Sequence, residues 1–157
     1  MSASCAHPAT AKPSRAEIRT ALSAAKARCV AANQRWTAQR ERALELLLEA
    51  GGPVKAYDLL AQFKTGAQTA PPTVYRALDT LVALGLVHRI ASLNAYTACN
   101  LTAEGHSPSF LICDCCGAAE EIATPTGGVL DAIRAQSNFQ PAHIAVEAHG
   151  LCAACRG

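Results

Sequence analysis

Two pairs of cysteines with the spacing Cys-x-x-Cys are the residues of this 157-residue chain best suited to chemistry. Cys113 and Cys116 lie in the stretch FLICDCC, residues 110–116. Cys152 and Cys155 lie close to the last residue of the sequence. Two such pairs can surround Zn²⁺ with four thiolates as a closed structural site. A single pair would fit a redox dithiol equally well, so the repetition favours zinc. The 35 residues between the pairs exceed the usual zinc-ribbon gap, and one ion would therefore join both ends of a small module.

The other cysteines have no partner of this kind. Cys115 lies inside the first pair, and adjacent cysteines do not easily share one tetrahedral ion, so we expect an exposed thiol there. We assign no role to Cys5 or Cys29.

A second group of ligands is predicted across a β-hairpin. Residues 86–99 alternate in polarity and predict two strands that turn around Leu93 and Asn94. If the loop has two or four residues, His88 lies directly opposite Cys99, with Cβ atoms about 4.5 to 5.5 Å apart, whereas an odd loop would break this pairing. His106 follows on the next connection, and either Glu120 or Glu121 adds a carboxylate. Together they would form a second zinc site, although a single histidine on a strand is more often structural.

The first helices are predicted from their caps. Ser14 as N-cap and Glu17 three residues later form a capping box before an Ala-rich helix that reaches about residue 33. Thr37 is the N-cap of a second helix that ends at Gly51. Residues 56–63 form a third, shorter helix.

The sequence PPTVYRALDTLVALG predicts a helix that begins at its two prolines and ends at Gly85. Helix, turn and helix followed by a hairpin is the order of a winged helix, whose second helix enters the major groove of DNA. Arg76 could contact a guanine there through two hydrogen bonds, and Tyr75 could contact a thymine methyl group or a phosphate. Phosphate contacts would come from Lys55, Tyr57, Arg40 and Arg89. The alternative is that Tyr75 and Arg76 belong to an ordinary solvated helix face.

The distribution of charge favours DNA as the partner. Residues 1–92 contain twelve of the 14 Lys and Arg, whereas the twelve acidic residues divide equally between this part and the rest. A basic first part suggests a polyanion as its partner. No apolar run is long enough for a membrane span, and the N-terminus lacks the apolar core of a secretory signal. We therefore expect a cytoplasmic protein, in which cysteines are thiols or metal ligands. No catalytic constellation or small-molecule site is apparent, so we do not expect an enzyme.

Four segments follow from these patterns, and they predict an α+β fold. Residues 1–15 form a disordered tail, 16–100 a winged-helix DNA-binding domain, 101–108 a hinge, and 109–157 a small α/β domain. In the last segment FLIC predicts a strand, AAEEI its partner, GGVLDAIRAQSNF a helix and HIAVEAHG a final strand.

The motifs WTAQRERALELL, KAYDLL, PPTVYRALDTLVALGLVHRI, FLICDCCGAAEEI and HGLCAAC together resemble the ferric uptake regulator family, most of all its zinc uptake regulator branch. The resemblance covers about residues 20–156. It implies a homodimer with a C-terminal dimerisation domain, and a repressor that binds palindromic operators of zinc-uptake genes when loaded with zinc. An iron or peroxide sensor of the same family is the nearest alternative, and a zinc-stapled interaction module without DNA binding is a more distant one.

The resemblance also implies ligand sets, with two zinc ions per subunit. The structural zinc ligands would be Cys113, Cys116, Cys152 and Cys155. The regulatory zinc ligands would be His88, Cys99, His106 and Glu121, which selects Glu121 over Glu120. Tyr75 and Arg76 would lie in the DNA-recognition helix.

Overall fold

The computed structural model describes residues 12–63, 70–100, 107–123, 127–141 and 144–156. These residues form two compact units, and the chain passes from the first to the second between Cys99 and Asn100. Most of the predicted tail and residues 101–106 of the predicted hinge lie outside the described part. Among the described helices, none combines the length and the apolar character needed to cross a membrane.

Two capped helices begin the first unit. Helix α1 (Arg15–Ala31) has the predicted capping box: the Ser14 hydroxyl accepts from the Glu17 N–H, and the Glu17 carboxylate accepts from the Ser14 N–H. These hydrogen bonds hold the pKa of Glu17 below its ordinary value. Helix α2 (Ala38–Ala50) begins after Thr37, whose side chain accepts from the Arg40 N–H, and ends at Gly51 in the left-handed conformation. The local signals therefore predicted both helix starts correctly.

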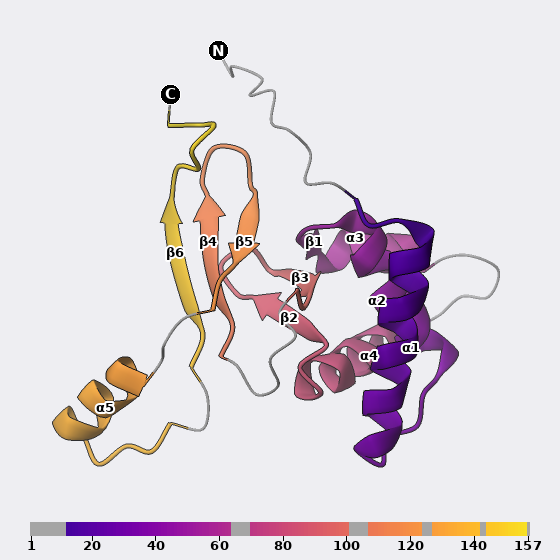
Figure 1. The fold of residues 1–157 in the computed structure, drawn as a ribbon, viewed down its shortest axis with the longest axis horizontal. Helices are drawn as coiled ribbons and strands as arrows, with labels where there is room; N and C mark the ends of the chain where they lie inside the picture. The colour runs from indigo at the N-terminus through magenta and orange to yellow at the C-terminus, as the bar shows by residue number, and fades with distance from the viewer. Residues whose placement is uncertain (1–11, 64–69, 101–106, 124–126, 142–143, 157) are drawn as a thin grey trace. The chain divides into compact units, whose positions relative to one another are not determined.

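A short helix, a second long helix and a small sheet complete the first unit. Helix α3 (Ala56–Gln62) is followed by α4 (Pro71–Ala83), which begins at its two prolines. Strands β2 (Val87–Ile90) and β3 (Ala95–Ala98) form the predicted hairpin. Strand β1 (Val54–Lys55), which the sequence pattern did not predict, pairs with β3 and gives the antiparallel order β1-β3-β2. Helix, helix and hairpin follow one another as in a winged helix, so this part of the prediction is confirmed (Figure 1).

The core of this unit places α4 against α2 and the sheet. Leu47 of α2, Leu59 of α3, and Val74 and Leu81 of α4 are each at most 1 % exposed and belong to one hydrophobic cluster. Because Val74 and Leu81 lie on the buried face of α4, the opposite face, with Tyr75 and Arg76, remains exposed.

The hairpin register differs from the predicted one. His88 pairs with Thr97, not with Cys99, and Ile90 pairs with Ala95. The turn occupies residues 91–94 and has Asn94 in the left-handed conformation at its end, whereas the prediction placed Asn94 at the centre. This moves every partner by two residues. A shift of two preserves the face of the strand, so Cys99 lies diagonally from His88 on the same side.

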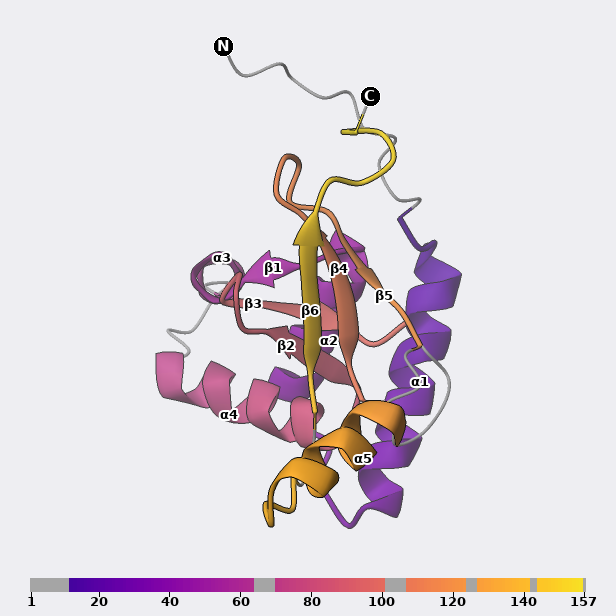
Figure 2. The same ribbon diagram turned by 90° about the vertical axis from the view of Figure 1, so that its left-hand side faces the viewer.

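The second unit contains one mixed sheet and one helix. Strand β4 (Ser109–Cys113) lies at the centre, between the antiparallel β5 (Ala119–Glu121) and the parallel β6 (Val146–Gly150). Helix α5 (Gly127–Gln136) lies near the end of the sheet where β4 and β6 begin, as Figures 1 and 2 show. The predicted α+β class and the predicted β4–β5 pairing are therefore confirmed. The parallel pairing places residues that follow β4 next to residues that follow β6.

Candidate functional site

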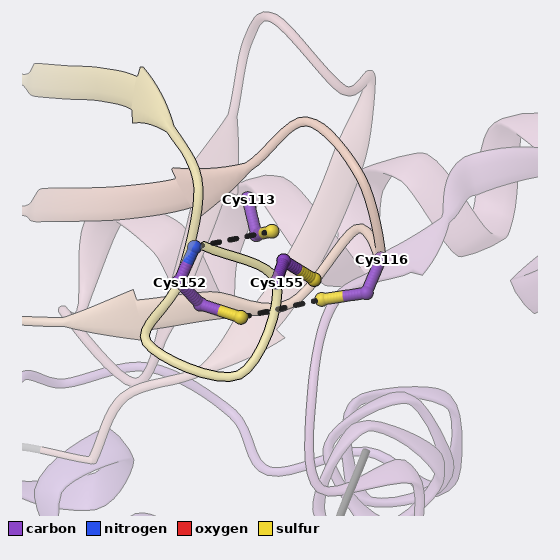
Figure 3. A group of neighbouring side chains, drawn as sticks. All are labelled: Cys113, Cys116, Cys152 and Cys155. Atoms are coloured by element: carbon purple, nitrogen blue, oxygen red, sulfur yellow. Dashed lines mark hydrogen bonds between the residues drawn. The ribbon is translucent and has the colours of Figure 1, made fainter. Parts of the chain in front are cut away.

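The four predicted zinc ligands converge at one end of the second unit. The sulfur atoms of Cys113, Cys116, Cys152 and Cys155 all lie within 4.8 Å of one another (Figure 3). Cys116 Sγ lies 3.9 Å from Cys152 Sγ, which is far longer than the roughly 2 Å of a disulfide. Four sulfurs about 2.3 Å from a tetrahedral Zn²⁺ are separated by about 3.8 Å. The observed separation fits a thiolate set around one zinc ion.

The backbone around the thiols explains this convergence. After β4 the chain turns at Gly117, which is in the left-handed conformation (φ 73°), and its N–H donates to the Cys113 carbonyl at 2.9 Å. The parallel pairing continues beyond Cys113, because the Asp114 N–H donates to the Gly150 carbonyl at 2.8 Å. Two residues later Cys152 begins a second turn, and its N–H donates to Cys113 Sγ at 3.3 Å. Each turn thus brings its pair of thiols to the same end of the sheet.

The ionisation of these thiols also suits a cation. The N–H of Cys152, with those of Cys116 and Cys115, lowers the pKa of Cys113 to about 6. At Cys116 the Ala118 N–H lowers the pKa, but burial and the Cys113 thiol outweigh it and raise the pKa above its ordinary value. Burial, followed by the neighbouring thiols, raises the pKa of Cys155. The Cys113 thiol therefore ionises readily, whereas Cys116 and Cys155 resist ionisation, and a cation at the centre would favour their deprotonation.

An exposed polar pair lies beside the cluster. His149 Nδ1 lies 3.0 Å from Asp114 Oδ1, and its Nε2 lies 3.9 Å from a Glu147 carboxylate oxygen. Asp114 directly follows Cys113 in the sequence, and His149 lies three residues before Cys152. The contact therefore links the turn after β4 to strand β6, which leads to the second cysteine pair. Cys115 is exposed, as predicted.

Two of the predicted regulatory ligands meet within the first unit. His88 is buried on β2, and Cys99 is half-buried directly after β3. The Cys99 thiol lies within 4.8 Å of an imidazole nitrogen of His88. The Cys99 N–H donates to the Leu86 carbonyl at 3.0 Å, which extends the pairing of the hairpin by one residue. The diagonal position that results is still close enough for both side chains to bind one ion.

The other two predicted ligands belong to later parts of the chain. Glu121 ends β5, and its carboxylate accepts from the Asn100 N–H at 2.8 Å. Asn100 follows Cys99 directly in the sequence. His106 lies outside the described residues.

The predicted DNA contacts fall into two groups. Five of the six residues are exposed: Tyr75 and Arg76 in the first turns of α4, Lys55 at the end of β1, Tyr57 in α3 and Arg89 on β2. Tyr57 is 79 % exposed, which is unusual for a large ring. Arg40 differs, because its side chain is half-buried and donates to Thr80 Oγ1 at 3.0 Å.

A winged helix followed by a small sheet that gathers four thiols at its end defines the class: a winged-helix protein with a metal-binding second unit. Residues 31–149 match the model of the Ferric uptake regulator family, and the chain belongs to this family. It is accordingly a metal-binding and DNA-binding transcription regulator, not an enzyme.

Several zinc regulators are similar to this chain. It is 42 % identical over 137 residues to the Zinc uptake regulation protein of Escherichia coli (strain K12). The aligned residues cover 85 % of this chain and 80 % of that protein. Among solved structures, a zinc uptake regulator complexed with zinc and DNA matches with a TM-score of 0.81 and 39 % identity, over 88 % of this chain and 95 % of that one. The crystal structure of holo XcZur matches with a TM-score of 0.78 and 41 % identity, over 87 % and 97 %. The predicted resemblance to zinc uptake regulators is thereby confirmed.

Proposed function

We propose that this protein is a zinc-dependent repressor that binds palindromic operators of zinc-uptake genes as a homodimer. The observation that carries the proposal is the approach of the His88 imidazole and the Cys99 thiol within the DNA-binding unit. A thiolate beside an imidazole is a donor set suited to zinc. The similarity to a zinc uptake regulator complexed with zinc and DNA supports both zinc and DNA as the molecules that this protein would bind.

The two proposed metal sites have different tasks. Cys113, Cys116, Cys152 and Cys155 would hold a structural zinc that stabilises the second unit. His88 and Cys99, joined by His106 and Glu121 from the second part of the chain, would hold the regulatory zinc. Ligands drawn from both parts would couple metal occupancy to the arrangement of the recognition helices.

Dimerisation is proposed for the second unit. Its sheet carries Leu111 at 45 % exposure, and Val129 of α5, Phe139 and Leu151 are 46 to 66 % exposed. Four exposed large apolar side chains on so small a unit favour burial of apolar surface against a partner. A twofold dimer would present two α4 helices to successive major grooves, and this is the reason to expect a palindromic operator.

The proposal is tested by counting metal and measuring DNA binding in the same preparations. We expect two zinc ions per chain, and we expect binding to a duplex that the zinc-loaded protein selects from a random-sequence pool. A chelator that removes one ion should abolish binding, and added zinc should restore it. Restoration by ferrous iron but not by zinc would identify an iron sensor instead. Failure to select any duplex at either metal loading would reject DNA binding altogether.

A further inference from the structure

Arg40 makes contacts that differ from those of the other predicted DNA-binding residues. Its guanidinium lies among three elements of the first unit: Nη2 donates to Thr80 Oγ1 of α4 at 3.0 Å, and Nη1 donates to the Arg35 carbonyl and lies 3.9 Å from Cys29 Sγ of α1. Both terminal nitrogens of this planar group therefore donate to protein atoms.

The contact with Thr80 continues to the recognition surface. The Thr80 hydroxyl donates to the Arg76 carbonyl at 3.0 Å, one turn earlier in α4. A hydroxyl has one hydrogen and two lone pairs, so Thr80 can accept from Arg40 and donate to Arg76 at the same time. A chain of hydrogen bonds thus runs from α2 to the backbone of the residue proposed to contact bases.

A second guanidinium secures the other end of α4. Arg28 of α1 donates to the Leu84 carbonyl at 2.8 Å, where a cation also interacts favourably with the negative end of the helix dipole. The apolar core holds the opposite face of α4, but burial of apolar surface has no preferred direction. Hydrogen bonds at Thr80 and Leu84 are directional and restrict the rotation and sliding of the helix.

We propose that Arg40 is a positioning residue, which acts through Thr80 to hold α4 in the rotation that presents Tyr75 and Arg76 to the bases. The inference rests on the proposed function, because it assigns the means by which the recognition helix is oriented. It replaces the predicted phosphate contact of Arg40. A fork that contacts guanine through two hydrogen bonds tolerates little misplacement, so a rotation of α4 would cost base discrimination before it cost general affinity.

The test uses full-length, zinc-loaded protein and two duplexes of equal length: one selected by the parent from a random-sequence pool, and one scrambled. Thr80→Val removes the acceptor without a change of charge, and we expect a loss of about fivefold to tenfold on the selected duplex. Thr80→Ser retains the hydroxyl and should bind like the parent. Arg40→Lys retains the charge but not the fork, and should lose as much as Thr80→Val.

The double variant Arg40→Lys/Thr80→Val should lose no more than either single variant, because both remove one interaction. Binding to the scrambled duplex should change little in all of them, and thermal unfolding measured in parallel shows whether the variants remain folded at the temperature of the assay.

Three outcomes would overturn the inference. Parent-like binding by Thr80→Val and Arg40→Lys, with Arg40→Met weakening both duplexes and lowering the salt slope by about 1, would make Arg40 a phosphate contact. Additive losses in the double variant would separate the two side chains. Equal losses on both duplexes would reduce Arg40 to a stabilising role. The proposed function fails separately, if the parent selects no duplex or if Arg76→Ala binds like the parent.

Discussion

The same side-chain chemistry has different consequences at different positions of this chain. The thiol of Cys113 has a lowered pKa because three backbone N–H groups donate to it, whereas burial opposes the ionisation of Cys155 only a few ångströms away. Cys99 has an imidazole as its neighbour. Cys29 is fully buried and donates to the Gln34 carbonyl at 3.3 Å. The surroundings of each sulfur therefore decide whether it is a candidate ligand or a part of the core.

We expect Cys99→Ser to separate the sensing of zinc from the folding of the protein. A hydroxyl is a poor zinc ligand compared with a thiolate, so the variant should lose one of two zinc ions and its zinc-dependent binding to the selected duplex. Metal analysis and fluorescence anisotropy measure these two effects.

The retained zinc is the internal control for that experiment. Cys99→Ser should keep one tightly bound ion and a parent-like circular dichroism spectrum, because the four-cysteine cluster is untouched. An undiminished response to zinc in DNA binding would remove Cys99 from the regulatory site.

Among the elements, the helix starts were predictable from local signals, whereas the register of the hairpin was not. The capping box at Ser14 and the cap at Thr37 depend on residues three positions away, so the sequence contains both partners of each hydrogen bond. The hairpin register depends on where the chain turns, and a difference of two residues moved the partner of His88 from Cys99 to Thr97. Cys99 still lies on the same face as His88 and close to it, because β side chains alternate with a period of two.

We expect Ser14→Ala to destabilise the first unit by about 1 kcal/mol, because the Glu17 N–H loses its acceptor at the start of α1. The effect should appear as a lower temperature for thermal unfolding of the zinc-loaded chain. Ser23→Ala is the matched control, since Ser23 is exposed inside the same helix and alanine favours the helix there. Equal changes in both variants would show that the cap contributes nothing.

The whole molecule divides its tasks between two units of different construction. The first unit has a continuous apolar core built from helices α1 to α4 and the hairpin. The second has a three-stranded sheet, exposed apolar side chains and four thiols that join both of its ends. A unit with so little core gains much of its stability from a bound metal or from a partner.

We therefore expect Cys113→Ser to lose the structural zinc and, with it, the fold and the dimer of the second unit. Removal of one thiolate from a closed site leaves three ligands and an incomplete charge balance. Metal content, circular dichroism and light scattering would measure the loss.

Cys115→Ser is the matched control, because this exposed cysteine lies two residues away in the same turn. It should retain zinc and the parent's size in solution. Parent-like zinc content and dimer in Cys113→Ser would reject the structural role of the cluster.

What the sequence alone determined is whatever depends on near neighbours or on residue type. The helix starts, the pairs Cys113–Cys116 and Cys152–Cys155, the order of a winged helix and the charge difference between the two parts are all of this kind. Spacing limits the geometry of such features strongly, because few backbone conformations connect residues two or three positions apart.

Tertiary structure alone decided the features that join distant segments. Strand β1, the parallel pairing of β4 with β6 and the hydrogen bond between Arg40 and Thr80, 40 residues apart, leave no periodic signal in the sequence. A charged residue near a helix start has the same local pattern whether it faces DNA or another helix. Only the packing of α2 against α4 brings the half-buried Arg40 guanidinium to Thr80, because burial is a property of the assembled elements and not of any one of them.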